Sequence, residues 1–329
     1  MRATRIAGFG DPEVLQPVEC EEPAPRAGWA VVELRAAGLN WHDCLVRQGA
    51  YPTVPLPLTL GADGAGVRRD TGEEVIIFPS LHWGADERHP GANFEILGDF
   101  TDGTYAELVA VPTQNLFLRP AGWSWSEAAA LGLGGATAYR AMVSRGGLAA
   151  DETVLVLGAG SGVSTIAVAL ARMAGARVFV TSSSPEKLAR AAELGAAGGA
   201  LYTEEDWPDR IRELAAPHGV DLVVDSAGAT WPQSLGVLAP GGRLVSFGAT
   251  AGDEATVAVR PFYFGQFSIL GSTMGSPRDF AGLLGLLGRD TGWRPAIDSV
   301  YPLERAAEAH TQMERREHFG KLVLTIGED

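Results

Sequence analysis

The stretch TVLVLGAGSGVS, residues 153–164, joins a short apolar run to a glycine-rich turn. The run has the continuous hydrophobicity of a strand that is buried on both faces of a parallel sheet. Gly158, Gly160 and Gly162 then allow a tight turn, in which backbone N–H groups can approach a pyrophosphate at the N-terminus of the next helix. The sequence differs from the G-x-G-x-x-G motif, because Val163 stands at the position of the last glycine. An ordinary strand–helix turn is the alternative, and the βαβ context favours nucleotide binding.

Strands and helices alternate after this turn. Helices are expected over 162–174 and from Ser184-Pro185, and further strands over 177–181, 199–203, 221–225, 243–248 and 267–272. Repeated βα units with short glycine-containing joints predict a doubly wound parallel sheet.

The chain before this region has a different pattern. Short β-like runs at 29–38, 73–79 and 104–112 predict an all-β module up to about Ala121. A helix is expected within 123–142 with Ser126 as its cap, helices near 279–289 and 304–316, and a final strand over 321–326 that returns to the first module. The predicted domains are therefore 1–122, 123–268 and a return segment, 269–329.

Composition excludes several classes of protein. The 329 residues include 40 Asp and Glu against 26 Lys and Arg, a net charge of −14, which disfavours nucleic acid and anionic membranes as ligands. Charged residues and glycines interrupt every apolar stretch before about 18 residues accumulate, so no membrane span is expected. Only Cys20 and Cys44 occur, as in proteins of a reducing compartment. We therefore expect a cytoplasmic protein.

The end of the second strand of the parallel sheet bears on the choice of cofactor. NAD-binding folds place Asp or Glu there for the ribose 2′-OH. Here the sequence is TSSSPEK, so Ser182, Ser183 and Lys187 lie in the corner that follows the second strand. Hydroxyls and a cation suit the 2′-phosphate of NADP(H). The alternative is a Ser-Pro helix start with a solvated lysine.

Many segments together resemble the medium-chain dehydrogenase/reductase family, in its zinc-free quinone oxidoreductase branch. They include AAGLNWHDCLVRQGAYP (36–52), LGADGAGV (60–67), DGTYAELVAVP (102–112), EAAALGLGGATAYRA (127–141), SSSPEKLARAAELGA (182–196), LAPGGRLVSFGATAG (238–252) and FGKLVL (319–324). The resemblance implies a GroES-like β-barrel catalytic domain, a Rossmann domain, hydride transfer with NADPH, and a homodimer or homotetramer.

The same resemblance bears on metal binding. The catalytic-zinc cysteine and histidine of zinc-dependent members correspond to Asn40 and Ala62, and their four-cysteine lobe corresponds to the cysteine-free segment 81–100. Catalytic zinc needs three protein ligands and structural zinc four. No metal is therefore expected, and His82 and His89 are interpreted as part of a polar surface loop.

Family motifs also suggest site residues. Tyr51 matches a proposed proton-donating tyrosine, and the alternative is that it only lines the substrate cleft. Asn40 is expected to contact the nicotinamide ribose and to take part in catalysis, while Asp43 and Asp63 organise the loop around it. The other expected cofactor contacts are Thr137, Gly160, Ser161, Gly162, Val163, Tyr202, Phe247, Gly248, Ala249, Thr273, Met274 and Lys321, the last as a phosphate contact.

The sequence thus predicts a zinc-independent, NADPH-dependent oxidoreductase that transfers hydride to a small quinone or α,β-unsaturated carbonyl compound. One alternative is an alcohol or aldehyde dehydrogenase of the same fold. Another is a non-catalytic nucleotide-binding or crystallin-like protein. Without zinc an alcohol substrate has no group that lowers its pKa, and an intact glycine turn is superfluous in a purely structural protein.

Overall fold

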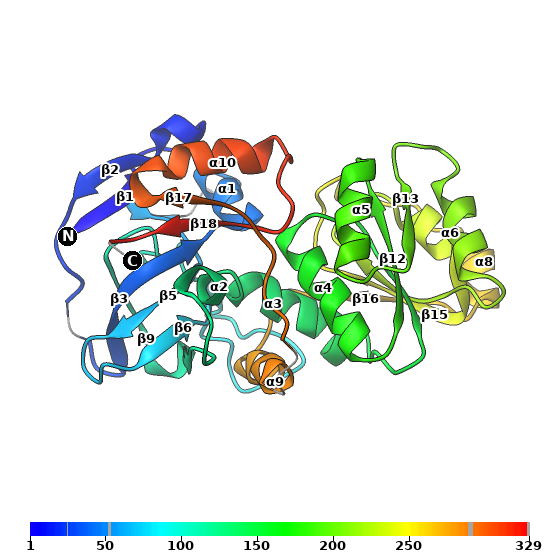
Figure 1. Cartoon of the computed structure of the whole chain (residues 1–329), viewed down its shortest axis with the longest axis horizontal. Coiled ribbons are helices and arrows are strands. Elements are labelled where there is room, and N and C mark those ends of the chain that lie inside the picture. Colours follow the sequence, from blue (N-terminus) through cyan, green and yellow to red (C-terminus); the bar gives the residue numbers. More distant parts are fainter. Residues whose placement is uncertain (25, 52–53, 289–291, 328–329) are drawn as a thin grey trace. The chain divides into compact units, whose positions relative to one another are not determined.

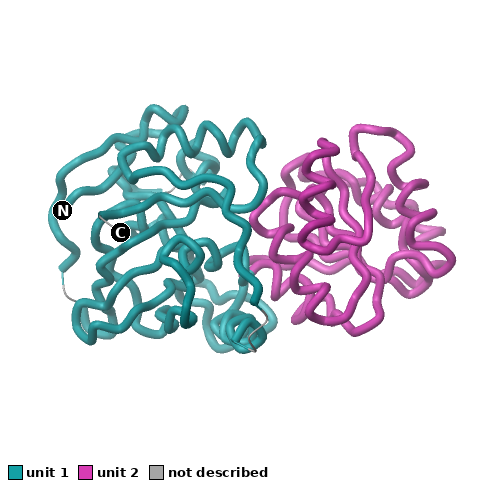
Figure 2. The backbone as a smooth tube through the Cα atoms, in the orientation of Figure 1, with its two compact units in different colours: residues 1–136, 275–329 teal, residues 137–274 magenta. Residues whose placement is uncertain are grey.

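The computed structural model describes residues 1–24, 26–51, 54–288 and 292–327. They form two compact units (Figure 2): unit 1 is Met1–Ala136 with Gly275–Asp329, and unit 2 is Thr137–Met274. These units divide the chain after Ala136 and Met274, whereas the domain boundaries expected from the sequence follow residues 122 and 268. Those boundaries stay a prediction about functional domains.

Unit 2 is built on a six-stranded parallel sheet in the order β13-β12-β11-β14-β15-β16. Its strands are β11 Thr153–Val156, β12 Arg177–Ser182, β13 Gly198–Leu201, β14 Val220–Asp225, β15 Leu238–Ser246 and β16 Ser268–Gly271. In order along the chain this is 3-2-1-4-5-6, the order of a Rossmann fold. The predicted doubly wound sheet is confirmed. Its order reverses at β11, between β12 and β14, where such sheets bind ligands.

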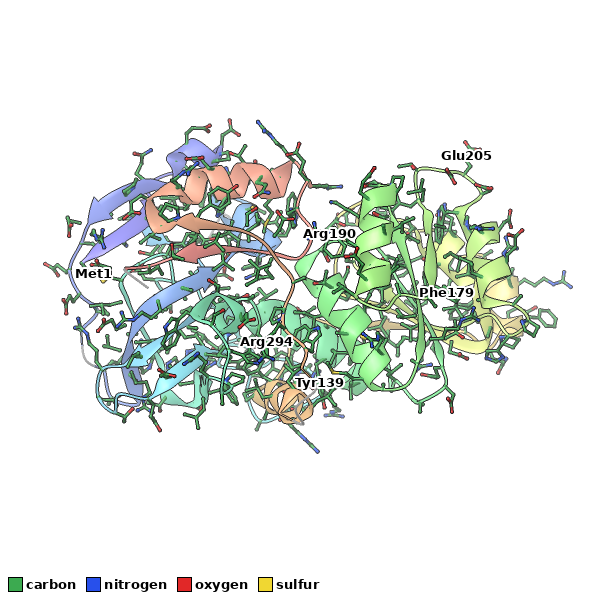
Figure 3. All side chains as sticks on the ribbon, in the orientation of Figure 1. Met1, Tyr139, Phe179, Arg190, Glu205 and Arg294 are labelled. Carbon is green, nitrogen blue, oxygen red and sulfur yellow. The ribbon has the colours of Figure 1, made fainter. Side chains whose placement is uncertain are left out.

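Helices cover this sheet (Figure 1). They are the π-helix η3 Arg140–Arg145 and the α-helices α4 Gly162–Met173, α5 Pro185–Glu193, α6 Trp207–Ala215, α7 Trp231–Gly236 and α8 Val259–Phe264. Helix α4 packs on β11 and β12, and α5 on β12 and β13. Phe179, labelled on β12 in Figure 3, is fully buried in this core. Burying such a side chain contributes roughly 1.5–3 kcal/mol.

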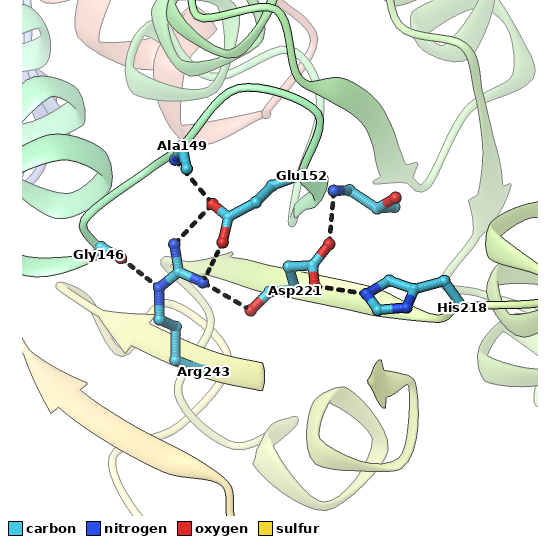
Figure 4. Close-up of polar contacts among 7 residues, drawn as sticks. Gly146, Ala149, Glu152, His218, Asp221 and Arg243 are labelled. Atoms are coloured by element: carbon cyan, nitrogen blue, oxygen red, sulfur yellow. Dashed lines mark hydrogen bonds and ion pairs between the residues drawn. The ribbon is translucent and has the colours of Figure 1, made fainter. Parts of the chain in front are cut away.

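An ion pair ties together the starts of the central strands (Figure 4). The Arg243 guanidinium donates to both carboxylate oxygens of Glu152, each at 2.8 Å, and to the Asp221 carbonyl at 3.2 Å. The Asp221 carboxylate accepts the N–H of Thr153 at 2.8 Å and contacts His218. These contacts join β15 to the amino ends of β11 and β14, at the edge opposite the glycine turn.

Replacing Glu152 by Gln is expected to lower the free energy of unfolding by about 2 kcal/mol. A hydrogen bond to a charged group contributes about 1.5–3 kcal/mol. Gln keeps one acceptor oxygen and replaces the other by an NH₂ donor, so one of the two bonds from Arg243 is lost and the guanidinium is left without its counter-charge. Urea unfolding followed by circular dichroism measures the effect. The matched control is Glu254→Gln, an exposed residue of the same unit. Equal midpoints for the two variants would contradict this account of the ion pair.

Unit 1 is mainly antiparallel. Its strands are β1 Arg2–Ile6, β2 Gln16–Glu19, β3 Trp29–Gly38, β4 Leu58–Thr59, β5 Asp63–Arg68, β6 Glu74–Ile77, β7 Ser80–Leu81, β8 Glu95–Ile96, β9 Leu108–Pro112, β10 Leu116–Leu118, β17 Ile297–Pro302 and β18 Lys321–Thr325. The largest sheet runs β10-β6-β5-β3-β18-β17, with β9 also on β3. Strand β18 pairs with β3, so the end of the chain completes this sheet. Strand β17 was not anticipated.

The helices of unit 1 include short 3₁₀ segments. They are α1 Trp41–Arg47, α2 Trp125–Ala129, α9 Pro277–Leu287 and α10 Ala306–Glu314, with η1 Pro12–Val14, η2 Thr113–Asn115 and η4 Leu303–Arg305. Helix α3, Gly132–Tyr139, carries the chain into unit 2. Position 289 of the expected helix 279–289 lies outside the described residues. Among those residues, none of the helices combines the length and hydrophobicity that a bilayer span requires.

The start of α2 corrects one prediction. The cap is Ser124, not Ser126: its hydroxyl accepts the N–H of Glu127, whose carboxylate accepts the N–H of Ser124. The S-x-x-E spacing of a capping box was the signal that the sequence analysis missed.

Candidate active site

The glycine turn after β11 has the backbone that its sequence demands. Gly158 and Gly160 have φ of 74° and 113°, a region that side-chain-bearing residues rarely adopt. The N–H of Gly158 donates to Thr181 Oγ1 at 3.2 Å, and that of Ala159 to the Thr181 carbonyl at 2.6 Å. The turn is thereby fixed to the neighbouring strand β12.

Helix α4 begins directly after this turn. Ser161 is its N-cap and accepts the N–H of Ser164 at 3.0 Å. The N–H groups of Gly162 and Val163 have no acceptor within the helix, because the first turn of any helix lacks one. They lie at the positive end of a 12-residue helix dipole. This end of α4 can therefore bind an anion such as a pyrophosphate.

The corner after β12 combines a helix cap with accessible donors. Ser182 is 1% exposed and its hydroxyl accepts the N–H of Ser184 at 3.3 Å, so of the two expected serines only Ser183 is exposed. Ser184 caps α5 and donates its hydroxyl to Glu186, which holds the pKa of that carboxyl below its usual range. Lys187 is half-buried. The Glu186 carboxylate is thus bound at the helix start.

Tyr202 joins this corner from the next strand. Its N–H donates to the Ser182 carbonyl at 2.9 Å, and its side chain is 44% exposed just after β13. Its ring is thus exposed beside the end of β12, and its expected contact with the cofactor stays a prediction.

The predicted contacts after β15 lie beside a buried aspartate that was not anticipated. Gly248 is required, because a Cβ there would lie 2.9 Å from the Ser226 carbonyl oxygen. Asp225 accepts hydrogen bonds from the N–H groups of Ala227 and Gly228 and from the Trp231 ring. It fixes the loop that faces Gly248. Phe247 and Ala249 flank Gly248; Phe247 is half-buried and Ala249 is exposed.

Three further predicted cofactor contacts lie at the first and last residues of the segment that forms unit 2. Met274 is 5% exposed and has a φ of 44°, a left-handed conformation that is uncommon for such a side chain. Thr273, next to it, is exposed. Thr137 Oγ1 is buried and has no hydrogen-bond partner among the described residues. A buried hydroxyl without a partner is costly unless a ligand or water completes it.

Asn40 lies in unit 1, at the start of α1, next to a buried ion pair. Lys321 Nζ donates to Asn40 Oδ1 at 2.7 Å and to Asp63 Oδ2 at 2.9 Å. Asp63 Oδ1 accepts the N–H of Leu133 at 2.6 Å, an approach that requires Gly132 because a Cβ there would lie 2.4 Å from this oxygen. Lys321 and Asp63 are 3% and 0% exposed.

This geometry assigns Lys321 a role other than the expected one. The family resemblance implied a contact with a phosphate, whereas the Lys321 ammonium is bound to two internal oxygens. An ammonium only donates, so Asn40 must turn its oxygen toward Lys321 and keep its N–H groups for other acceptors. One of these lies 3.4 Å from the Gly38 carbonyl oxygen. Lys321 thus orients the amide of Asn40.

A series of buried, hydrogen-bonded side chains holds the backbone of Asn40. Asp43 Oδ2 accepts the N–H of Asn40 at 2.8 Å and the Tyr105 hydroxyl at 3.2 Å. The Tyr105 oxygen lies 3.1 Å from His310 Nε2, and His310 Nδ1 lies 3.4 Å from Cys44 Sγ. Burial lowers the pKa of His310 to about 3 and raises that of Asp43 to about 6. A neutral His310 therefore donates from Nε2. No local sequence pattern indicated these contacts.

Tyr51 lies beside the same helix. It is 39% exposed, and the centroid of its ring lies 5.3 Å from that of His42. His42 Nε2 lies 2.6 Å from Asp99 Oδ1. Pro52, which ends the GAYP element, is outside the described residues.

The described residues contain no group of three or more His, Cys, Asp or Glu side chains arranged to bind a metal ion. His82 and His89 make separate contacts, with Glu95 at 3.9 Å and Asp86 at 3.6 Å. Both side chains are exposed, as expected for a polar loop.

Two family models match the chain. One, described as an alcohol dehydrogenase GroES-like domain, matches residues 26–121, and one described as a zinc-binding dehydrogenase matches residues 162–289. The first agrees with the GroES-like domain expected from the sequence.

Individual proteins match over almost the whole chain. Rat quinone oxidoreductase is 31% identical, over 99% of this chain and 98% of its own, and human synaptic vesicle membrane protein VAT-1 homolog is 32% identical, over 99% and 87%. A solved NAD-dependent alcohol dehydrogenase has a TM-score of 0.93 at 40% identity, covering 99% of this chain and 100% of its own. A mycobacterial protein solved with NADPH has a TM-score of 0.83 at 27% identity, over 99% and 100%.

Proposed function

Because the chain belongs to the medium-chain dehydrogenase/reductase family, we propose that this oxidoreductase works without zinc and uses NADPH to reduce a quinone or an α,β-unsaturated carbonyl compound. The proposal includes a cytoplasmic homodimer or homotetramer, as the family resemblance implies. It is carried by the Lys321 ammonium, which is bound to Asn40 and Asp63. By the family resemblance Asn40 stands at the position of a cysteine ligand of zinc-dependent members, and Asp63 follows Ala62, which stands at that of their histidine ligand.

Lys321 argues against a metal on electrostatic grounds. A buried ammonium a few ångströms from the same oxygens repels a divalent cation, and Ala62 offers no donor atom. A catalytic zinc needs three protein ligands. The residues at this position therefore do not fit zinc.

The residues of unit 2 do fit a nicotinamide dinucleotide phosphate. The N–H groups of Gly162 and Val163 would bind the pyrophosphate at the start of α4. Ser183 and Lys187 would bind the 2′-phosphate, with Glu186 held away by Ser184. NADPH, when bound, supplies the hydride.

Other expected contacts would orient the nicotinamide end. Thr137 has a hydroxyl that lacks a partner within the described residues and can bond to a polar group of the cofactor. Thr273, exposed beside Met274, offers a second hydroxyl. In unit 1 the Asn40 amide, held through its oxygen by Lys321, keeps N–H groups for a ribose hydroxyl.

A second candidate is supported by one finding. The solved structure that is 40% identical is described as an NAD-dependent alcohol dehydrogenase. Oxidation of an alcohol needs a group that lowers the pKa of its hydroxyl, which zinc provides in metal enzymes. Asn40 and Ala62 do not supply that metal, so this function ranks second.

An acceptor panel tests the proposed function. Quinones, enals and alcohols are assayed with NADPH and NADH, or with their oxidised forms for the alcohols, by following nicotinamide absorbance. We expect NADPH oxidation with quinones or enals. Turnover of alcohols alone would support the dehydrogenase, and turnover of none would favour a non-catalytic nucleotide-binding protein.

Zinc content provides a separate prediction. The purified protein should contain no stoichiometric zinc and should keep its activity after prolonged treatment with a strong chelator. Elemental analysis of the same sample measures the metal. About one tightly held zinc per chain, removable only with loss of activity, would refute the zinc-free assignment.

A further inference from the structure

We propose that His42, held by Asp99, delivers the proton in the proposed reduction, and that Tyr51 packs beside it without donating. This inference rests on the proposed function for the hydride half of the reaction. It names a catalytic residue that neither the sequence analysis nor the family motifs identified.

The pair is close and shielded from water. His42 comes from the first turn of α1, two residues after Asn40, and Asp99 from the segment that follows β8. His42 Nε2 lies 2.6 Å from Asp99 Oδ1, and the two side chains are 13% and 12% exposed. The contact is short enough for a strong, charge-assisted hydrogen bond.

Asp99 determines which nitrogen of His42 can act. A carboxylate only accepts, so the hydrogen of the neutral ring is on Nε2 and Nδ1 is the free nitrogen. In the described part of the chain Nδ1 has no hydrogen-bond partner. When the ring is protonated, Nδ1 becomes a donor while Asp99 stabilises the positive charge, the arrangement by which a carboxylate supports a histidine acid.

The two candidate acids differ in strength. Burial alone would lower the pKa of His42, but the hydrogen bond and charge of Asp99 outweigh it and raise that pKa above its usual value. Burial and the charge of Asp99 raise the pKa of Tyr51 above that of an ordinary phenol. A general acid works best when its pKa is near the working pH, and a phenol at about 10 or above is far from it.

The other charged groups near His42 do not change which of the two residues, His42 or Tyr51, is the stronger acid. Asp43, the next residue of α1, also favours the imidazolium form. Of the titratable groups on α10, His310 and Glu314 contact Cys44 and Arg47, and Glu308 pairs with Arg305.

The chemistry balances with one proton from His42. NADPH, when bound, would supply the hydride for a new C–H bond at the β-carbon of the acceptor, and the π electrons would move to the carbonyl oxygen as an enolate. The Nδ1–H bond of protonated His42 then breaks and its proton joins the enolate. The neutral ring takes a new proton from water.

Kinetics of two variants separate the candidate acids. His42→Asn should lower kcat for an enal about 10²-fold or more, a usual effect of losing a general acid, while the Kd for NADPH changes little. Tyr51→Phe keeps the ring against His42 and should lose less than tenfold. His89→Asn, in the exposed loop, is the matched control and should behave as the parent.

The pH profile gives a second readout. Because the acid must be protonated, kcat should fall as the pH rises through the pKa of His42. In Asp99→Asn this fall should move to lower pH. In the cofactor-free protein, an NMR titration of the His42 ring should show the same shift in its pKa, which a purely structural role for Asp99 would not produce.

Each outcome decides between the claims. A loss of about 10²-fold in Tyr51→Phe together with less than tenfold in His42→Asn would overturn the inference and assign the proton to the phenol. An unchanged His42 titration in Asp99→Asn would also overturn it. If the parent reduces no acceptor of the panel, it is the proposed function that fails.

Discussion

Lys321→Met is expected to lower the free energy of unfolding by about 3–5 kcal/mol, because it leaves the Asp63 carboxylate buried without its cation. Asp63 is fully buried and Lys321 3% exposed, so water cannot replace the lost partner without opening the core of unit 1. The Nζ–Oδ2 distance of 2.9 Å is that of a direct charge-assisted hydrogen bond. Denaturant unfolding monitored by circular dichroism measures the change.

The controls separate charge from packing. Lys187→Met makes the same replacement at the only other lysine, which is half-buried in unit 2, and should cost much less. Adding Asp63→Asn to Lys321→Met should recover part of the loss, because the uncompensated charge is then gone. A Lys321→Met protein as stable as the parent would mean that the ion pair does not stabilise unit 1.

Lys187→Ala is expected to weaken NADPH binding about 10- to 150-fold and to leave NADH binding nearly unchanged. A hydrogen bond to a charged group contributes about 1.5–3 kcal/mol, and each 1.4 kcal/mol is about tenfold in affinity. NADH lacks the 2′-phosphate and so has little to lose. Fluorescence titration with both cofactors measures the two dissociation constants.

The matched control is Arg210→Ala, which removes an exposed cation of α6 in the same unit. It should change neither dissociation constant by more than about twofold. An equal loss for both cofactors in Lys187→Ala would mean that Lys187 acts through the fold. A preference of the parent for NADH would remove NADPH from the proposed function.

Local sequence patterns predicted most of the elements of unit 2. Strand β11 and helix α5 follow from an apolar run and a Ser-Pro cap, signals that span a few residues. In unit 1, β3 was equally clear, but β17 was not. Its burial alternates poorly, and none of its residues is fully buried, so the hydrophobic pattern is weak.

The candidate site was predictable where function depends on backbone conformation. Gly158 and Gly160 reveal their role because only glycine adopts their φ readily. Side-chain partnerships were not predictable in this way. Lys321 and Asp63 are 258 residues apart in the sequence, and His42 and Asp99 are 57 apart, so only the tertiary fold brings them together.

Isotope transfer in metal-free protein tests the central claim most directly. The chelator-treated enzyme is given an α,β-unsaturated aldehyde and NADPH that carries deuterium at the transferable position of its nicotinamide. We predict a saturated aldehyde with deuterium on the β-carbon, formed without added metal. Deuterium on the carbonyl carbon of an allylic alcohol, or turnover that returns only when zinc is added, would contradict the assignment as a zinc-independent reductase of conjugated carbonyl compounds.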